Sequence, residues 1–174
     1  MNVVVTEYNE DWKQKFSEEA QKIKNIFGDE LIDIHHIGST SVPGLKAKPI
    51  IDIMPVVKDI EKVDSFNEQM EDIGYECMGE LGMNGRRYFR KGGDNRTHQV
   101  HVFQRDNKED IGRHLAVRDY LRAHPDYANR YGDLKESLAI QFPKDIEAYM
   151  DGKDAFVKEL EKYALLWSNG CNEC

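Results

Sequence analysis

The spacing of apolar residues alternates between helical and strand-like patterns through the N-terminal part of the chain. Apolar residues at helical spacing predict one helix over about residues 10–27 and a second over 60–73, each ending before a glycine. Residues 31–37 are predicted to form the first central strand, and the apolar run at 50–57 predicts a second strand that is covered on both faces. Residues 3–5 are expected to form a short edge strand.

Glycine-containing turns divide the next segment into three further predicted strands, at residues 75–80, 86–91 and 97–103. The chain is then predicted to be helical from Glu109 onward. A first helix is broken near Pro125, a second runs from Tyr127 to Phe142, and a third runs from Ile146 to Trp167, with Gly152 expected to interrupt it. Strands followed by helices predict an α+β fold.

Length and composition fit one soluble domain. The chain has 174 residues, 40% of them hydrophobic and 32% charged, so we expect a single domain over residues 1–170 with a helical C-terminal subregion at 109–168. No apolar run approaches the roughly 18 residues that cross a membrane. The first residues lack the basic and apolar segments of a signal peptide, which predicts a cytoplasmic protein without a membrane partner.

Charge and cysteine content exclude two further classes. A net charge of −8 argues against nonspecific binding of nucleic acid, so no nucleic-acid partner is expected and any anionic ligand has to be met by local cations. Cys171 and Cys174 have the spacing of a metal or redox pair, but they lie in a polar terminal segment and are interpreted as a frayed tail. The sequence carries no signal for an oligomeric state.

The segment between the two central strands has the composition of a phosphate-binding loop. Gly38, Ser39, Thr40 and Ser41 offer hydroxyl groups and closely spaced backbone N–H groups, and Lys48 adds a cation nearby. The alternative is a structural turn, since glycine and serine favour turns in any protein.

Asp52 is unexpected because it lies inside an apolar strand. An ionised and unpaired carboxylate in such a layer costs several kcal/mol, so a metal ion or a cationic partner is the favoured explanation. Alternation along the strand places Met54 on the same face as Asp52.

The amino-acid sequence of this loop and strand resembles that of one protein family. The run from His36 to Leu45, followed by Ala47 to Ile53, resembles the GrpB family, whose members are grouped with nucleotidyltransferases by fold. The resemblance continues at residues 86–91, 97–102 and 114–125, and so covers nearly the whole chain. It implies a nucleotidyltransferase-like mixed sheet with flanking helices and a helical C-terminal part.

The resemblance also implies an activity, which is metal-assisted transfer of a nucleotidyl group from a nucleoside triphosphate to an acceptor. Asp52, Lys48 and His101 are the candidate catalytic residues, and Asp52 and His101 are the candidate ligands of a divalent cation, Mg²⁺ or Mn²⁺. Imidazole favours manganese, iron or zinc over magnesium, so an Asp52–His101 pair would shift the metal preference. The superfamily pattern has a second carboxylate where this chain has Met54, and a methionine thioether does not ligate magnesium.

Histidine and arginine positions extend the candidate site. Strand alternation places His98 and His101 on opposite faces, and a hydrogen-bonded core role for His101 remains an alternative to a metal role. The candidate phosphate-binding residues are Gly38, Ser39, Thr40, Ser41, Lys48, Arg86, Arg87 and Lys153. A solvated edge strand explains the two arginines equally well.

Three functions compete at this point. The first is the transferase, in which Ser39, Lys48, Asp52 and His101 are expected to converge on one cleft. The second is a catalytically degenerate module that binds a nucleotide or another phosphorylated small molecule. Met54 favours it, and the fusion of some family members to dephospho-coenzyme A kinase links it to coenzyme A metabolism. The third, a purely structural protein, leaves Asp52 unexplained and is the least favoured.

Overall fold

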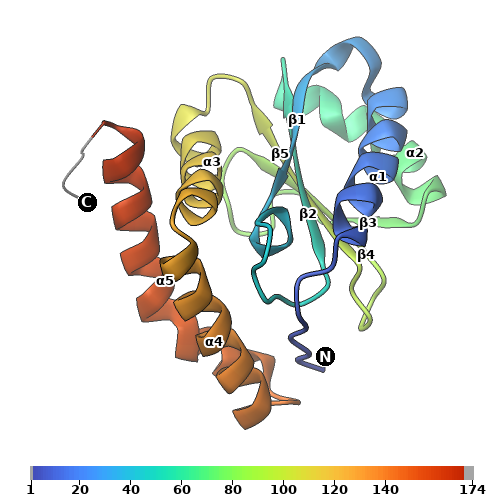
Figure 1. The fold of residues 1–174 in the computed structure, drawn as a ribbon. Helices are drawn as coiled ribbons and strands as arrows, with labels where there is room; N and C mark the ends of the chain where they lie inside the picture. Colours follow the sequence, from blue (N-terminus) through green and yellow to red (C-terminus); the bar gives the residue numbers. More distant parts are fainter. Residues whose placement is uncertain (1, 171–174) are drawn as a thin grey trace. The chain divides into compact units, whose positions relative to one another are not determined.

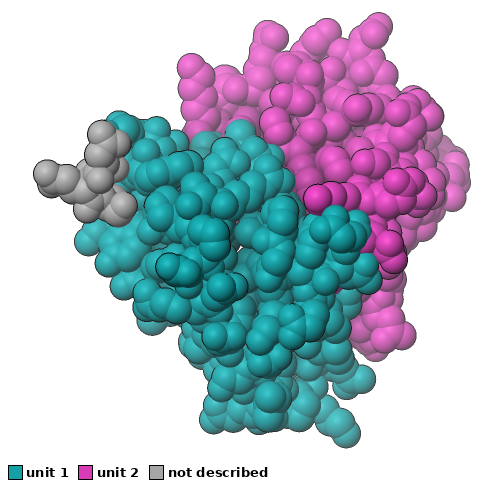
Figure 2. All heavy atoms as spheres, in the orientation of Figure 1, with its two compact units in different colours: residues 1–10, 38–49, 112–174 teal, residues 11–37, 50–111 magenta. Residues whose placement is uncertain are grey.

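The computed structural model describes residues 2–170 and divides into two compact units. Unit 1 is the described part of residues 1–10, 38–49 and 112–174, and unit 2 comprises residues 11–37 and 50–111 (Figure 2). The single domain expected over residues 1–170 stays a prediction. Cys171 and Cys174, interpreted as a frayed tail, lie outside the described residues.

Unit 2 is a five-stranded mixed sheet with helices (Figure 1). The strand order is β1-β2-β5-β4-β3, in which β2 and β5 are parallel and all other neighbours are antiparallel. The mixed α+β architecture predicted from the sequence is thereby confirmed. The elements of unit 2 are α1 (Asp11–Phe27), η1 (Gly28–Glu30), β1 (Leu31–Ile37), β2 (Ile51–Val57), η3 (Ile60–Phe66), α2 (Asn67–Asp72), β3 (Tyr75–Cys77), β4 (Arg86–Lys91) and β5 (His98–Gln104).

Alternation gives this sheet two chemically different faces. One face is covered by α1, η3 and α2, where the His36 ring stacks on Phe16 at 4.7 Å and Phe27 stacks on Phe66 at 5.0 Å. We call it the helix-covered face. The opposite face, called the Asp52 face, carries the side chains that strand register aligns with Asp52. Of the aromatic residues of α1, Trp12 and Phe27 are buried in the core and Phe16 is half-buried.

The predicted helix over 60–73 and the predicted edge strand at 3–5 were wrong. The segment predicted as one helix over 60–73 is a 3₁₀ helix, η3, followed by the short α2. The Ser65 hydroxyl donates to the carbonyl of Lys62 at 2.6 Å, and such local bonds compete with α-helical pairing. Residues 3–5 form no edge strand. The nearest strand pairing is an isolated β-bridge between Thr6 and Ala47.

Unit 1 consists of the N-terminal segment 2–10, the loop 38–49 and a helical part. Its loop contains the single turn η2 (Ser39–Ser41), and its helices are most of α3 (Lys108–Ala123), α4 (Pro125–Gln141) and α5 (Ile146–Ser168) (Figure 1). Pro125 occupies the first turn of α4, where its missing N–H costs no helical bond, and this separates α4 from α3. The core of the unit is rich in tyrosine and includes Tyr120, Tyr127 and Tyr131.

Gly152 does not interrupt the last helix, contrary to the expectation from the sequence. The helix α5 runs through it without a break. A Cβ atom at this position would lie 2.4 Å from Leu138 Cδ2 of α4. Glycine is therefore present because α4 and α5 approach each other closely here.

We expect Gly152→Ala to destabilise the protein by about 1 kcal/mol, since overpacking against buried Leu138 outweighs the gain in helix propensity. Gly112→Ala in α3 is the matched control. An added Cβ there meets no atom within 4 Å, so this variant should gain up to about 1 kcal/mol. Urea denaturation of both variants measures the difference, and equal stabilisation of the two would contradict the close-packing explanation.

Candidate functional site

The Gly38–Ser41 loop is held in one conformation by bonds within unit 1. Gly38 has φ +73°, a left-handed backbone that favours glycine. Ser41 donates its N–H to the Gly38 carbonyl at 3.1 Å, and its hydroxyl donates to the same oxygen. Arg122 of α3 donates to the Ser41 carbonyl from Nε at 3.0 Å and from Nη2 at 2.8 Å. Thr40 is buried in the turn.

Lys135 of α4 reaches this loop from the interior of unit 1. Its side chain is almost entirely excluded from solvent, with 2% relative exposure. Its Nζ donates to Ser39 Oγ at 2.8 Å and lies 4.4 Å from the centre of the Tyr131 ring. A hydroxyl oxygen and an aromatic face are weak partners for a buried ammonium group.

Two further lysines surround a second buried tyrosine. Lys48 Nζ lies 5.1 Å from the centre of the Tyr149 ring, and Lys153 Nζ lies 5.3 Å from the same point. Burial and the positive charges of Lys153 and Lys48 together lower the pKa of Lys135 well below its usual value. We call Lys48, Lys135 and Lys153 the lysine cluster.

Lys135 is electrostatically unfavourable in this position. A buried ammonium group loses hydration, and neighbouring cations add repulsion. A bound phosphate would reverse both costs, because its oxygens accept charge-assisted hydrogen bonds from lysines. Strongly perturbed lysines in such an environment are typical of functional sites.

Sequence reasoning named Ser39, Lys48 and Lys153 but missed Lys135. The signal was present, because Lys135 lies four residues after Tyr131 and three before Leu138, on the apolar face of α4. A lysine at a position where a helix should be buried is itself an indicator of an internal polar site.

In unit 2, Asp52 and His101 form a hydrogen-bonded pair. Asp52 Oδ1 lies 3.1 Å from His101 Nε2, and both side chains are partly buried. The Tyr88 ring lies 5.3 Å from the His101 ring, and burial together with the charge of Asp52 raises the Tyr88 pKa. The strand register thus brings Asp52 and His101 to one face, while their role in catalysis or metal binding stays a prediction.

This pair provides too few ligands for two cations. Two ligand atoms about 3 Å apart suit neighbouring positions around a single cation with bonds of about 2.1 Å. Among residues 2–170, however, no group of three or more His, Cys, Asp or Glu side chains is placed to hold a metal ion. Met54, on the same face as Asp52, is fully buried and offers no oxygen. The described residues therefore do not fit a two-metal site.

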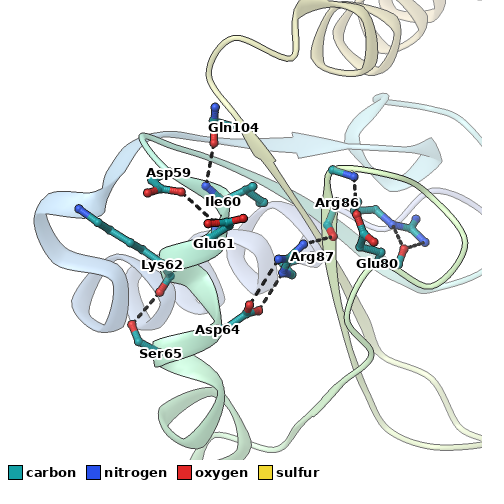
Figure 3. Close-up of polar contacts among 11 residues, drawn as sticks. Asp59, Ile60, Glu61, Lys62, Asp64, Ser65, Glu80, Arg86, Arg87 and Gln104 are labelled. Carbon is teal, nitrogen blue, oxygen red and sulfur yellow. Dashed lines mark hydrogen bonds and ion pairs between the residues drawn. The ribbon is translucent and has the colours of Figure 1, made fainter.

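Arg86 and Arg87 of β4 make protein contacts within unit 2 (Figure 3). Arg87 binds Asp64 of η3 through Nε at 2.8 Å and Nη2 at 3.3 Å. Arg86 donates to the carbonyls of Glu80 and Leu81 in the turn before β4. These contacts fix η3 and the turn, and the phosphate-binding role of the two arginines stays a prediction.

The family model described as GrpB protein matches residues 2–163. The chain belongs to the GrpB family. It is 52% identical over 165 residues to the UPF0157 protein YqkA of Bacillus subtilis, covering 95% of this chain and 48% of that protein. It is 34% identical to the glutamate-rich protein GrpB of Alkalihalophilus pseudofirmus, covering 91% of this chain and 93% of that protein.

A solved structure has the same fold. The crystal structure of the conserved protein GrpB from Enterococcus faecalis superposes with a TM-score of 0.91 at 54% identity, covering 93% of this chain and 97% of that one. The chain thus spans nearly all of that GrpB protein but only about half of YqkA.

Two more distant kinds of protein are also similar to this chain, a polymerase in its fold and dephospho-CoA kinases in their sequence. Cid1 poly(U) polymerase, solved as a mutant bound to MgATP, matches with a TM-score of 0.52 at 13% identity over 80% of this chain and 44% of that one. This supports a nucleotidyltransferase-like fold. A dephospho-CoA kinase of Mycolicibacterium paratuberculosis is 22% identical, covering 91% of this chain and 45% of that protein. Within residues 2–170, no helix has the length and apolar character to cross a membrane.

The lysine cluster predicts an unusual pH dependence of stability. The pKa of Lys135 is lowered on folding, so between that lowered pKa and about 10.5 the unfolded chain binds more protons than the folded protein. The contribution of Lys135 to the free energy of unfolding therefore rises with pH in this range. Lys135→Met removes this contribution. It should stabilise the ligand-free protein at neutral pH by about 1 kcal/mol or more.

Lys46→Met is the control with the same change in charge. Lys46 binds Asp133 and Glu136 at 3.3 Å and 3.1 Å, and its pKa is raised by these partners. Its loss should therefore slightly destabilise the protein at neutral pH. Chemical denaturation of both variants from pH 6 to pH 10 measures the two signs, and destabilisation by Lys135→Met would argue against an unfavourable buried cation.

Proposed function

We propose that the Ser39 loop and the lysine cluster bind the phosphates of a nucleoside triphosphate or another phosphorylated small molecule. The observation that carries this proposal is Lys135, a buried cation that touches Ser39 and lies near two further cations. Three ammonium groups suit a ligand with several negative charges better than a ligand with a single carboxylate. The hydroxyl of Ser39 adds a hydrogen-bonding group.

The comparisons agree with this class of ligand. The Cid1 polymerase of the same fold type was solved with MgATP, and a nucleotide is therefore a reasonable first ligand to test. The similarity to dephospho-CoA kinases supports an alternative ligand from coenzyme A metabolism, whose members also carry phosphates. Both ligands would use the same cluster.

Nucleotidyl transfer is a second candidate function, and the Asp52–His101 pair is the observation that favours it. A hydrogen-bonded carboxylate and imidazole is an arrangement that accepts and moves protons. Asp52 would orient the ring through Nε2. Because the described ligands do not fit two cations, we assign this pair no step that depends on a metal ion.

Binding can be tested with inorganic triphosphate and the four common nucleoside triphosphates. Calorimetry should show saturable binding to the parent protein, and Lys135→Met should weaken it by about tenfold or more, the effect of losing one charge-assisted contact. Lys46→Met should change the affinity by less than about twofold, because its charge is already paired. No saturable binding of any of these five ligands by the parent would overturn the nucleotide proposal.

Transfer and simple binding differ in how they depend on Asp52. If Asp52 holds a cation, Asp52→Asn should abolish any dependence of nucleotide affinity on Mn²⁺ or Mg²⁺, while Met54→Asp should strengthen it by supplying a second carboxylate. Titration of MnCl₂ with each variant measures this. Equal metal affinity in the parent and both variants would exclude Asp52 as a metal ligand and leave phosphate binding without transfer.

A further inference from the structure

A cavity of about 100 Å³ adjoins the Ser39 loop within unit 1. Most of its wall is apolar, and its lining includes Ser39, Val117, Leu121, Tyr131, Leu160 and Glu161. An apolar or planar group fits such a wall, because pockets of this kind bind the uncharged part of a ligand.

Two residues connect this cavity to the lysine cluster. Ser39 lines the cavity and accepts the hydrogen bond of Lys135, and the ring of Tyr131 lies beneath the same ammonium group. Tyr131 is fixed by stacking on Phe156, with ring centres 5.2 Å apart and planes inclined by 10°. A ligand whose phosphates contact Ser39 and Lys135 would therefore place its next group against this wall.

Glu161 contributes a carboxylate to this mostly apolar wall. Its side chain is half-buried on α5, and among residues 2–170 no hydrogen bond or ion pair to its carboxylate is found. An ionised carboxylate only accepts hydrogen bonds. A carboxylate beside apolar residues thus selects a ligand group that presents N–H donors.

We propose that this cavity binds the base of a guanine nucleotide, with Glu161 accepting from N1–H and the N2 amino group; this rests on the proposed phosphate site. Guanine presents two adjacent N–H donors along one edge, which match the two oxygens of a carboxylate. Adenine and cytosine present only an amino group beside a ring-nitrogen acceptor, and uracil presents a single N–H between two carbonyls. Arg118, which also lines the cavity, suits the O6 acceptor of guanine.

Competition among nucleotides tests this assignment. Calorimetry on the full chain with GTP, ITP, ATP, UTP, CTP and inorganic triphosphate should rank GTP first by about tenfold over ATP, UTP and CTP. The affinity for ITP, which lacks the N2 amino group, should lie between the affinity for GTP and the affinities for ATP, UTP and CTP. Glu161→Gln should reduce GTP affinity by about tenfold and leave inorganic triphosphate unchanged, since the phosphate contacts are intact.

Glu147→Gln, an exposed glutamate of the same helix, is the matched control and should leave GTP affinity unchanged. Equal affinity for all four common nucleotides would overturn the guanine assignment and leave the phosphate site standing. Binding of none of these ligands, inorganic triphosphate included, would overturn both. A Glu161→Gln protein with parental melting temperature and parental GTP preference would also overturn the role of Glu161.

Discussion

The burial of one ammonium group constrains unit 1 more than any other interaction in it. Lys135 is excluded from water, contacts the Ser39 hydroxyl, and lies over the Tyr131 ring. Because aromatic faces and hydroxyl oxygens compensate only part of the lost hydration, the surrounding chain has to be rigid enough to keep the cation in place. Arg122 provides part of that rigidity by holding the Ser41 carbonyl with two hydrogen bonds.

The sheet of unit 2 separates two kinds of polar chemistry onto its two faces. His98, three residues before His101, lies on the helix-covered face, where burial lowers its pKa and the charge of Glu19 opposes that shift. Glu19 itself binds Lys91, so this face contains a paired network of the kind that fixes a helix on a sheet. His101 contacts Asp52 on the other face. An odd spacing along one strand thus gives two histidines different roles.

Sequence patterns predicted most of the fold because strand alternation and helix amphipathicity are local properties. The limits of β1 and β4 and the placement of Asp52 beside His101 follow from alternation and register alone. Lys135 was missed because a lysine in a helix is usually solvated, although its spacing from Tyr131 and Leu138 places it on the apolar face of α4. The cavity beside Glu161 depends on how three helices pack against each other and against the Ser39 loop, and no local pattern encodes such a space.

The two kinds of candidate chemistry belong to different sets of residues, and this bears on how function is retained or lost. The phosphate-type cluster is built from unit 1 alone, whereas Asp52, His101 and Met54 belong to unit 2. A methionine in place of a carboxylate at position 54 leaves out a potential cation ligand and changes no residue of the lysine cluster. The proposed phosphate site and the proposed transfer chemistry therefore rest on different residues and can be lost separately by substitution. In the proposed phosphate complex, the ligand would offset the cost of burying Lys135 beside other cations.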